Sequence, residues 1–108
     1  PAVPNEAPIW DLARKHGCEL TTEVNLAIAY SAKTPTVAIT GTHGKSTCAS
    51  LLHHMLGDNT ILAGNLGGSF LEQVLSQPDC TGIVVEMSSF QCERLVAPRG
   101  WPHVAALT

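Results

Sequence analysis

The stretch from residue 37 to residue 52 constrains the fold of this chain more than any other. It reads Val-Ala-Ile-Thr-Gly-Thr-His-Gly-Lys-Ser-Thr-Cys-Ala-Ser-Leu-Leu. The apolar residues 37–39 predict a short buried strand, the glycines that follow predict a tight loop, and an amphipathic helix is expected to begin at Lys45 or Ser46. Such a loop turns backbone N–H groups and the positive end of a helix dipole toward an anion. The alternative is an ordinary strand–turn–helix connection that uses glycine only for its backbone freedom.

Two side chains at the end of this loop suit a nucleotide phosphate. Lys45 adds a positive charge, and Ser46 adds a hydroxyl able to ligate magnesium. The common phosphate-loop pattern G-x-x-x-x-G-K-[ST] begins with a glycine where this chain has Ile39. The pattern here is the shorter G-x-x-G-K-S, so the strand before it and the helix after it are what favour a phosphate-binding role.

The composition indicates a small domain with little charge. The chain has 108 residues, of which 14% are charged, against about 25% in typical soluble domains. This length fits one small domain or a piece of a larger one, and the low charge predicts that more chain, a partner or a ligand covers part of the surface. The net charge of −3 gives no electrostatic reason to expect nucleic acid or an anionic membrane as a partner. Because the sequence has no long apolar run and no signal peptide, we expect a soluble, cytoplasmic protein.

The cysteines and histidines do not predict a metal site. The four cysteines lack C-x-x-C spacing and lie in or beside apolar runs, which favours buried free thiols over disulfides or zinc ligands; they are Cys18, Cys48, Cys80 and Cys92. The adjacent pair His53 and His54 cannot share one face of a helix, because metal-binding pairs on helices need i, i+4 spacing.

Helices and strands alternate along the chain. Helices are expected from Pro8 to Gly17, from Thr21 or Thr22 to about residue 32, over 45–56, over 69–76 and within 88–95. Strands are expected over 18–20, 37–39, 60–63, 82–86 and 103–107. The 45–56 helix is expected to bury Cys48, Leu51, Leu52 and Met55. Near-continuous apolar strands alternating with helices predict an α/β fold with a parallel sheet covered by helices on both faces.

Three features follow strands and should meet at the carboxyl edge of this sheet, where α/β proteins bind ligands. They are the loop 41–45, a second glycine-rich loop over 64–68, and Glu86 with the segment after it. A carboxylate at the tip of an apolar strand beside a phosphate loop holds magnesium in phosphoryl-transfer sites, although Glu86 could instead cap a turn or face water. Ser88, Ser89 and Gln91 offer hydrogen bonds to a substrate's phosphate or sugar, or else cap the short helix that follows.

These segments resemble the Mur ligase family. Residues 40–47, Thr-Gly-Thr-His-Gly-Lys-Ser-Thr, resemble its short phosphate loop, and residues 64–67, Gly-Asn-Leu-Gly, resemble its G-N-[IL]-G loop. Residues 86–91, Glu-Met-Ser-Ser-Phe-Gln, resemble the E-x-S-S-F-Q segment of the branch that adds D-glutamate. The start, Pro1-Ala-Val-Pro4, is similar to the end of that branch's S-P-G-[IV]-x motif, and Thr22-Glu23-Val24 is similar to its entry into the central domain.

The resemblance implies a domain division and an activity. Residues 1–21 correspond to the tail of the N-terminal domain that binds the UDP-linked substrate, and residues 22–108 to the first half of the P-loop-containing, ATP-binding central domain. The implied activity is an ATP-dependent ligase that joins D-glutamate to UDP-N-acetylmuramoyl-L-alanine through an acyl phosphate. That reaction belongs to peptidoglycan synthesis, and so to cell-wall formation, cell shape and division. The full-length protein is expected to act as a monomer.

The resemblance also implies site residues. Lys45 and Glu86 are the expected catalytic residues, and Ser46 and Glu86 the expected magnesium ligands. Asn65, Ser88 and Gln91 are expected to face the UDP-linked substrate. The residues expected to bind ATP are Gly41, Thr42, His43, Gly44, Lys45, Ser46 and Thr47.

Two other functions remain open at this point. One is another Mur-type ligase, such as the L-alanine-adding enzyme, against which the Ser-Ser-Phe-Gln segment argues. The other is a non-catalytic nucleotide-binding module. The family's second magnesium ligand, its carbamylated lysine and its amino-acid-binding domain have no counterpart in these 108 residues, so we expect this chain alone to lack ligase activity.

Overall fold

A computed structural model describes residues 3–4 and 6–108 of the chain. The strands are β1 (Thr36–Thr40), β2 (Thr60–Gly64), β3 (Gly82–Glu86) and β4 (Val104–Leu107). The helices are α1 (Pro8–Lys15), α2 (Glu23–Ser31), α3 (Lys45–Leu56), α4 (Phe70–Ser76) and α5 (Ser89–Glu93). The first two residues of the Pro1–Pro4 resemblance lie outside the described residues.

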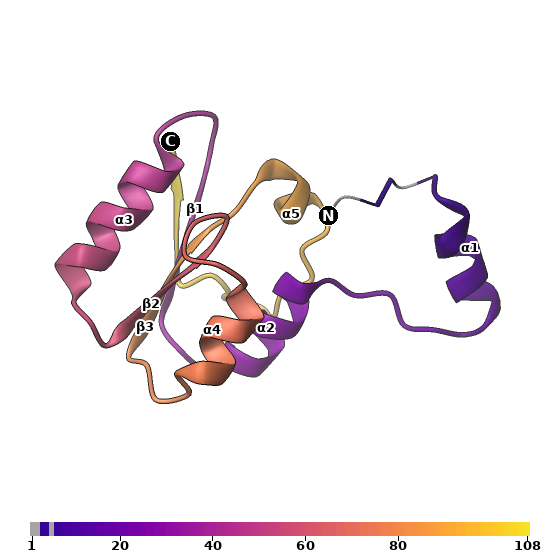
Figure 1. The fold of residues 1–108 in the computed structure, drawn as a ribbon, viewed down its shortest axis with the longest axis horizontal. Helices are drawn as coiled ribbons and strands as arrows, with labels where there is room; N and C mark the ends of the chain where they lie inside the picture. The colour runs from indigo at the N-terminus through magenta and orange to yellow at the C-terminus, as the bar shows by residue number, and fades with distance from the viewer. Residues whose placement is uncertain (1–2, 5) are drawn as a thin grey trace.

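The four strands form one parallel sheet in the order β2-β3-β1-β4 (Figure 1). The chain passes from β1 through α3 to β2 and leaves a gap that β3 later fills. As a result β3 pairs with β1 on one side and with β2 on the other, and Glu86 lies in register with both Ile39 and Gly64. The predicted α/β fold with a parallel sheet is confirmed.

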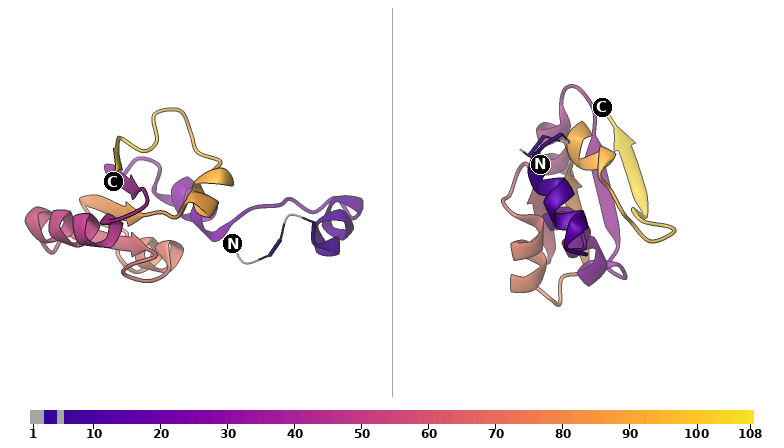
Figure 2. Two further views of the ribbon diagram at one scale, coloured as in Figure 1. Left: turned by 90° about the horizontal axis from the view of Figure 1, so that it is seen from above. Right: turned by 90° about the vertical axis from the view of Figure 1, so that its right-hand side faces the viewer.

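The central strand β3 is buried on both faces, as its run of apolar residues predicted. Ile83 and Val85 point into the larger core cluster, which α2 and α4 cover. Val84 points the other way and packs with Ile39 and Ala49 beneath α3. Because neighbouring side chains of a strand alternate between faces, one five-residue strand supplies both layers of the core. Figures 1 and 2 show the helices on the two sides of the sheet.

The packing face of α3 differs from the one that the sequence predicted. Its buried residue is Ala49, flanked by the partly buried Cys48 and Leu52. Leu51 and Met55 are exposed, at 58% and 73%, so their predicted burial was wrong. A small alanine lets the helix lie close against the sheet, and that approach turns the larger residues outward.

Two further expectations are corrected in the same way. Residues 18–20 form no strand, because they lie in an exposed connection between α1 and α2 with no neighbouring strand to pair with. All four cysteines are free, as predicted, but none is fully buried and Cys18 is exposed. Burial raises the pKa of the Cys80 thiol, so its thiolate form is even less favoured than that of an ordinary cysteine.

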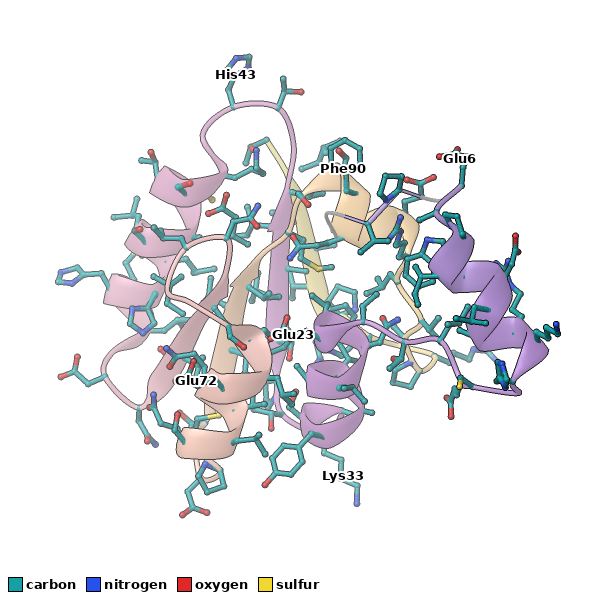
Figure 3. The ribbon with its side chains drawn as sticks, turned by 45° about the vertical axis from the view of Figure 1, so that its right-hand side comes forward. Glu6, Glu23, Lys33, His43, Glu72 and Phe90 are labelled. Carbon is teal, nitrogen blue, oxygen red and sulfur yellow. The ribbon has the colours of Figure 1, made fainter. Side chains whose placement is uncertain are left out.

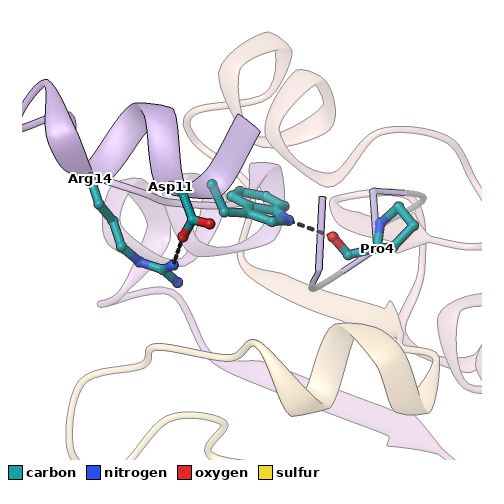
Figure 4. A network of polar contacts seen from close by, with 4 residues as sticks. Pro4, Asp11 and Arg14 are labelled. Carbon is teal, nitrogen blue, oxygen red and sulfur yellow. Dashed lines mark hydrogen bonds and ion pairs between the residues drawn. The ribbon is translucent and has the colours of Figure 1, made fainter. Parts of the chain in front are cut away.

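The N-terminal arm, residues 6–20, stands to one side of the sheet (Figures 1 and 2). No residue of α1 is buried. Instead the Trp10 indole N–H donates to the Pro4 carbonyl at 2.5 Å, and Arg14 pairs with Asp11 at 3.2 Å (Figure 4). The Arg94 guanidinium lies 5.5 Å from the Trp10 ring centre, which links the arm to the end of α5. Within the described part of the chain, every helix is too short or too polar to cross a membrane.

Phe70 tests the assignment of the core to the α2–α4 face of the sheet. Its side chain is fully buried among residues of α2, β2 and β3. Replacing it by alanine (Phe70→Ala) should lower the free energy of unfolding by about 3–5 kcal/mol, because the truncation leaves a cavity. Urea unfolding measures this loss. Leu75, on the same helix but 52% exposed, is the control, and Leu75→Ala should change stability by less than about 0.5 kcal/mol. Equal losses would contradict the described packing.

Candidate functional site

Three segments meet at the carboxyl edge of the sheet, as the topology of parallel strands requires. The Met87 amide donates to the Ile39 carbonyl at 2.9 Å, which joins the end of β3 to the end of β1. The Asn65 amide donates to the Glu86 carbonyl at 3.2 Å, which joins the loop after β2 to the same point. The loops 41–45 and 64–68 and the segment after Glu86 therefore form one rim.

The first rim element is the loop 41–44 and the start of α3. Gly44 occupies the N-cap of α3 with φ of 77° and offers no side-chain acceptor. In contrast, α2, α4 and α5 are each capped by a hydroxyl, from Thr22, Ser69 and Ser88 respectively. The first-turn amides of α3, the longest helix in the described structure, thus have no side-chain cap to satisfy them. Such a turn favours a bound anion.

Gly41 is needed here for a steric reason that the sequence pattern did not reveal. A Cβ atom at this position would lie 2.0 Å from the Thr108 carbonyl oxygen. The end of β4 runs against the loop at this point, where the Thr42 amide donates to the Thr108 carbonyl at 3.2 Å. Glycine lets β4 approach and fixes the base of the loop.

Lys45 lies across this loop. Its ammonium group donates to the Gly41 carbonyl at 2.9 Å. Among the described residues, no ion pair joins Lys45 to a carboxylate. Its positive charge is held over the loop by a neutral acceptor and remains available to an anionic ligand.

Glu86 is the most unusual side chain of the rim. It is 3% exposed, and its Oε2 atom is buried without a hydrogen-bond partner. It follows Val84 by two residues and therefore lies on the α3 face of the sheet, the face that carries the loop 41–45. A buried carboxylate oxygen without a partner is unfavourable unless a cation or a donor meets it. The carboxylate thus fits a metal ion.

A metal ion here would need ligands from outside the protein. No group of three or more histidine, cysteine or acidic side chains among the described residues could hold one. Magnesium is commonly held by one or two protein oxygens together with substrate phosphates. One buried carboxylate, with the Ser46 hydroxyl at the start of α3, suits that kind of site.

The second rim element, the loop 64–68, lies directly against Glu86. Gly64 has φ of 96°, and a Cβ atom there would lie 2.0 Å from the Glu86 carbonyl oxygen. The Gly64 amide donates to the Gly68 carbonyl at 3.2 Å, which closes the loop on itself. The Asn65 side chain is exposed beside the end of β3.

Ser88 and Gln91 form the capping box of α5, the local role that the sequence left open for them. The Ser88 hydroxyl accepts from the Gln91 amide at 3.2 Å, and Gln91 Oε1 accepts from the Ser88 amide at 2.8 Å. These oxygens are engaged in the cap, which fixes both side chains at the rim. Any contact with a substrate stays a prediction.

The remaining loop residues point toward solvent. Thr42, His43, Ser46 and Thr47 are exposed, and Figure 3 shows the His43 ring projecting outward from the tip of the loop. A separate cavity of about 250 Å³ lies between the N-terminal arm and the start of α2, and none of its lining residues belongs to the rim.

Glu23 is a residue whose contacts the sequence gave no reason to expect. An acid in the first turn of a helix normally complements that helix's own dipole. Here the Glu23 carboxylate reaches the start of a different helix, α4, where it accepts from the Ser69 hydroxyl and the Leu71 amide. No local pattern signals a contact between residues so far apart in the chain.

Three known proteins similar to this chain share one name. The chain is 40% identical over 110 residues to the UDP-N-acetylmuramoylalanine--D-glutamate ligase of Geobacter metallireducens, a match that covers 99% of the chain and 24% of that enzyme. It is 41% identical over 98 residues to the ligase of the same name from Caldicellulosiruptor saccharolyticus, a match that covers 88% of the chain and 22% of that enzyme. It is also 41% identical over 96 residues to the Synechocystis enzyme of that name, a match that covers 86% of the chain and 21% of that enzyme.

The chain spans about a quarter of the length of these curated relatives, 24% in the first of them. No protein-family model matches it.

Gly64 provides a test of the rim geometry. The variant Gly64→Ala should destabilise the chain by more than about 2 kcal/mol, because the methyl group would strike the Glu86 carbonyl in addition to straining the backbone. The matched control is Gly57→Ala, since Gly57 has φ of 88° but nothing within 4 Å of an added Cβ. It should lose only about 1 kcal/mol, from backbone strain alone. Thermal unfolding compares the two, and a control loss as large as that of Gly64→Ala would contradict the close approach.

Proposed function

We propose that this chain carries the ATP-phosphate and first magnesium site of a UDP-N-acetylmuramoylalanine–D-glutamate ligase, an enzyme of the Mur ligase family. Along nearly its whole length the chain is homologous to a segment of these ligases. The proposed reaction is the ATP-dependent joining of D-glutamate to UDP-N-acetylmuramoyl-L-alanine in peptidoglycan synthesis. The relatives' shared name favours D-glutamate over the L-alanine of the alternative ligase.

One juxtaposition supports the proposal. A glycine-capped helix start with a lysine held by a backbone carbonyl lies at the same edge of the sheet as a buried carboxylate oxygen that lacks a partner. The first two features attract phosphate, and the third attracts a cation. ATP with magnesium supplies both, and neither phosphate alone nor a metal alone accounts for all three.

The loop residues have assigned roles in this proposal. The backbone amides of residues 41–44 line the β- and γ-phosphates, and Lys45 leaves the Gly41 carbonyl to neutralise their charge. Thr47 and the exposed Thr42 and His43 complete the nucleotide site. The helix dipole of α3 adds a positive potential that needs no movement.

Ser46 and Glu86 are the residues that would hold magnesium. The bound ion would supply charge neutralisation between the phosphate oxygens. The Glu86 carboxylate is already buried away from water, so binding of the metal ion would remove little more water from it.

The two chemical steps then depend on the alignment of the substrates more than on reactive side chains of the protein. A carboxylate oxygen of UDP-N-acetylmuramoyl-L-alanine attacks the γ-phosphorus of ATP, the bond to ADP breaks, and an acyl phosphate forms. The amine of D-glutamate attacks the acyl carbon and loses a proton, and inorganic phosphate leaves. Asn65, Ser88 and Gln91 lie at the rim where they would orient the UDP-linked substrate. Lys45 stabilises charge as it moves onto the leaving ADP.

Phosphate release tests this function in the protein that carries the chain. Release from ATP should require both D-glutamate and UDP-N-acetylmuramoyl-L-alanine, and L-alanine should not replace D-glutamate. The variant Lys45→Ala should lower kcat/KM by at least about 100-fold, because the transferring phosphoryl group loses its cation.

The matched control is Lys33→Ala, which removes an exposed lysine from beyond the end of α2, far from the rim (Figure 3). It should retain the activity of the unchanged protein. Activity that persists in Lys45→Ala, or phosphate release that does not depend on D-glutamate, would contradict the proposal.

A further inference from the structure

Glu23 connects two segments that are distant in the sequence. It is the first residue of α2, and its Oε1 atom accepts two hydrogen bonds from the start of α4. The donors are the Ser69 hydroxyl at 2.7 Å, an ordinary length for such a bond, and the Leu71 amide at 2.5 Å, which is short for an N–H donor. In Figures 1 and 3 the N-terminal ends of α2 and α4 lie beside each other.

These two bonds complete the N-terminus of α4. Ser69 is the N-cap residue, and its hydroxyl accepts from the Glu72 amide at 3.2 Å while it donates to Glu23. The Leu71 amide is one of the first-turn donors that a helix leaves without an internal partner. A carboxylate supplied by α2 therefore satisfies α4 and favours its dipole.

The start of α4 is continuous with the rim loop 64–68. Ser69 follows Gly68, whose carbonyl accepts from the Gly64 amide at 3.2 Å. One turn into α4, the Gln73 side-chain amide donates to the Gly67 carbonyl at 2.8 Å. The loop is thus held at one end by Glu86 of β3 and at the other end by α4, and Glu23 fixes α4 to α2.

The composition of the loop explains why such an outside contact matters. Residues 64–68 read Gly-Asn-Leu-Gly-Gly. Glycine backbones have wide conformational freedom, so this loop has little intrinsic preference for the shape that places Asn65 beside Glu86. Contacts at its two ends must define that shape.

We propose that Glu23 is a positioning residue that holds the loop 64–68, and through it Asn65, in the geometry that receives the UDP-linked substrate. This inference rests on the proposed function for the identity of that substrate. Glu23 acts on one side of the rim only, because its contacts lead to α4 and the loop 64–68 and not to the loop 41–45. Its loss should weaken binding of the UDP-linked substrate while leaving ATP binding unchanged.

The test compares Glu23→Ala with Glu23→Gln, which keeps an acceptor oxygen, and with the control Glu72→Ala. Glu72 is an exposed acid in the first turn of α4, and its carboxylate makes no hydrogen bond or ion pair with the other described residues. Hydrogen exchange of the amides 65–68 reports on the loop. Titration calorimetry of the protein that carries the chain gives the Kd of ATP with magnesium and of UDP-N-acetylmuramoyl-L-alanine.

Glu23→Ala should speed exchange in the loop and raise the Kd of UDP-N-acetylmuramoyl-L-alanine about two- to tenfold, the range set by losing hydrogen bonds at an exposed site. The Kd of ATP should stay within about twofold, Glu23→Gln should recover part of the loss, and Glu72→Ala should match the unchanged protein.

Two results would overturn the inference. One is unchanged loop exchange in Glu23→Ala. The other is an equal rise in both dissociation constants, which would mean that Glu23 only stabilises the fold. A protein that binds neither ATP nor the UDP-linked substrate before any substitution would instead refute the proposed function, and loop exchange in the variants would still decide whether Glu23 holds the loop.

Discussion

The parallel pairing of β3 with β1 is the constraint on which the rest of the structure depends. It puts Glu86 in register with Ile39, the penultimate residue of the strand that leads into the glycine loop. It also buries every residue of β3, so the carboxylate at its end is withdrawn from water. A different strand order would leave the same residues in the chain but separate the acid from the loop. The site is therefore a consequence of topology more than of any single motif.

The charged groups of the rim are not paired with one another. Lys45 is held by a carbonyl, Glu86 keeps an oxygen without a partner, and the start of α3 has no side-chain cap. In a structure built only for stability these groups would satisfy each other. Because one part of the rim suits an anion and another suits a cation, we propose a magnesium–nucleotide complex as its occupant. Ser88 and Gln91, in contrast, already satisfy each other in part and serve to hold the segment after β3 in place.

Much of the fold could be predicted from the sequence because the strongest signals are local. The strand and helix around the loop 41–44 were predicted nearly to the residue, and the two-sided burial of β3 followed from its continuous apolar run. The expectations for residues 18–20, Leu51 and Met55 failed because they depended on tertiary neighbours. A short apolar run becomes a strand only where another strand can pair with it. Likewise, the buried stripe of α3 was set by the small Ala49 and not by its largest residues.

The site was partly predictable for the same reason. The glycines, Lys45 and Glu86 could be expected at one edge, since the carboxyl ends of parallel strands meet there. The reach of Glu23 to α4 and the close approach of Thr108 to Gly41 could not, because both join segments that are distant in sequence. Such contacts decide how firmly the rim is held.

The magnesium dependence of ATP binding tests most directly whether Glu86 and the loop 41–47 form one site. Titration calorimetry at a series of magnesium concentrations, on the protein that carries the chain, would compare Glu86→Gln with the unchanged protein and with Glu72→Gln as an exposed control. A shared site predicts that magnesium tightens ATP binding about tenfold or more in the unchanged protein and in Glu72→Gln, and that Glu86→Gln loses most of this gain. Equal magnesium dependence in all three proteins would contradict it.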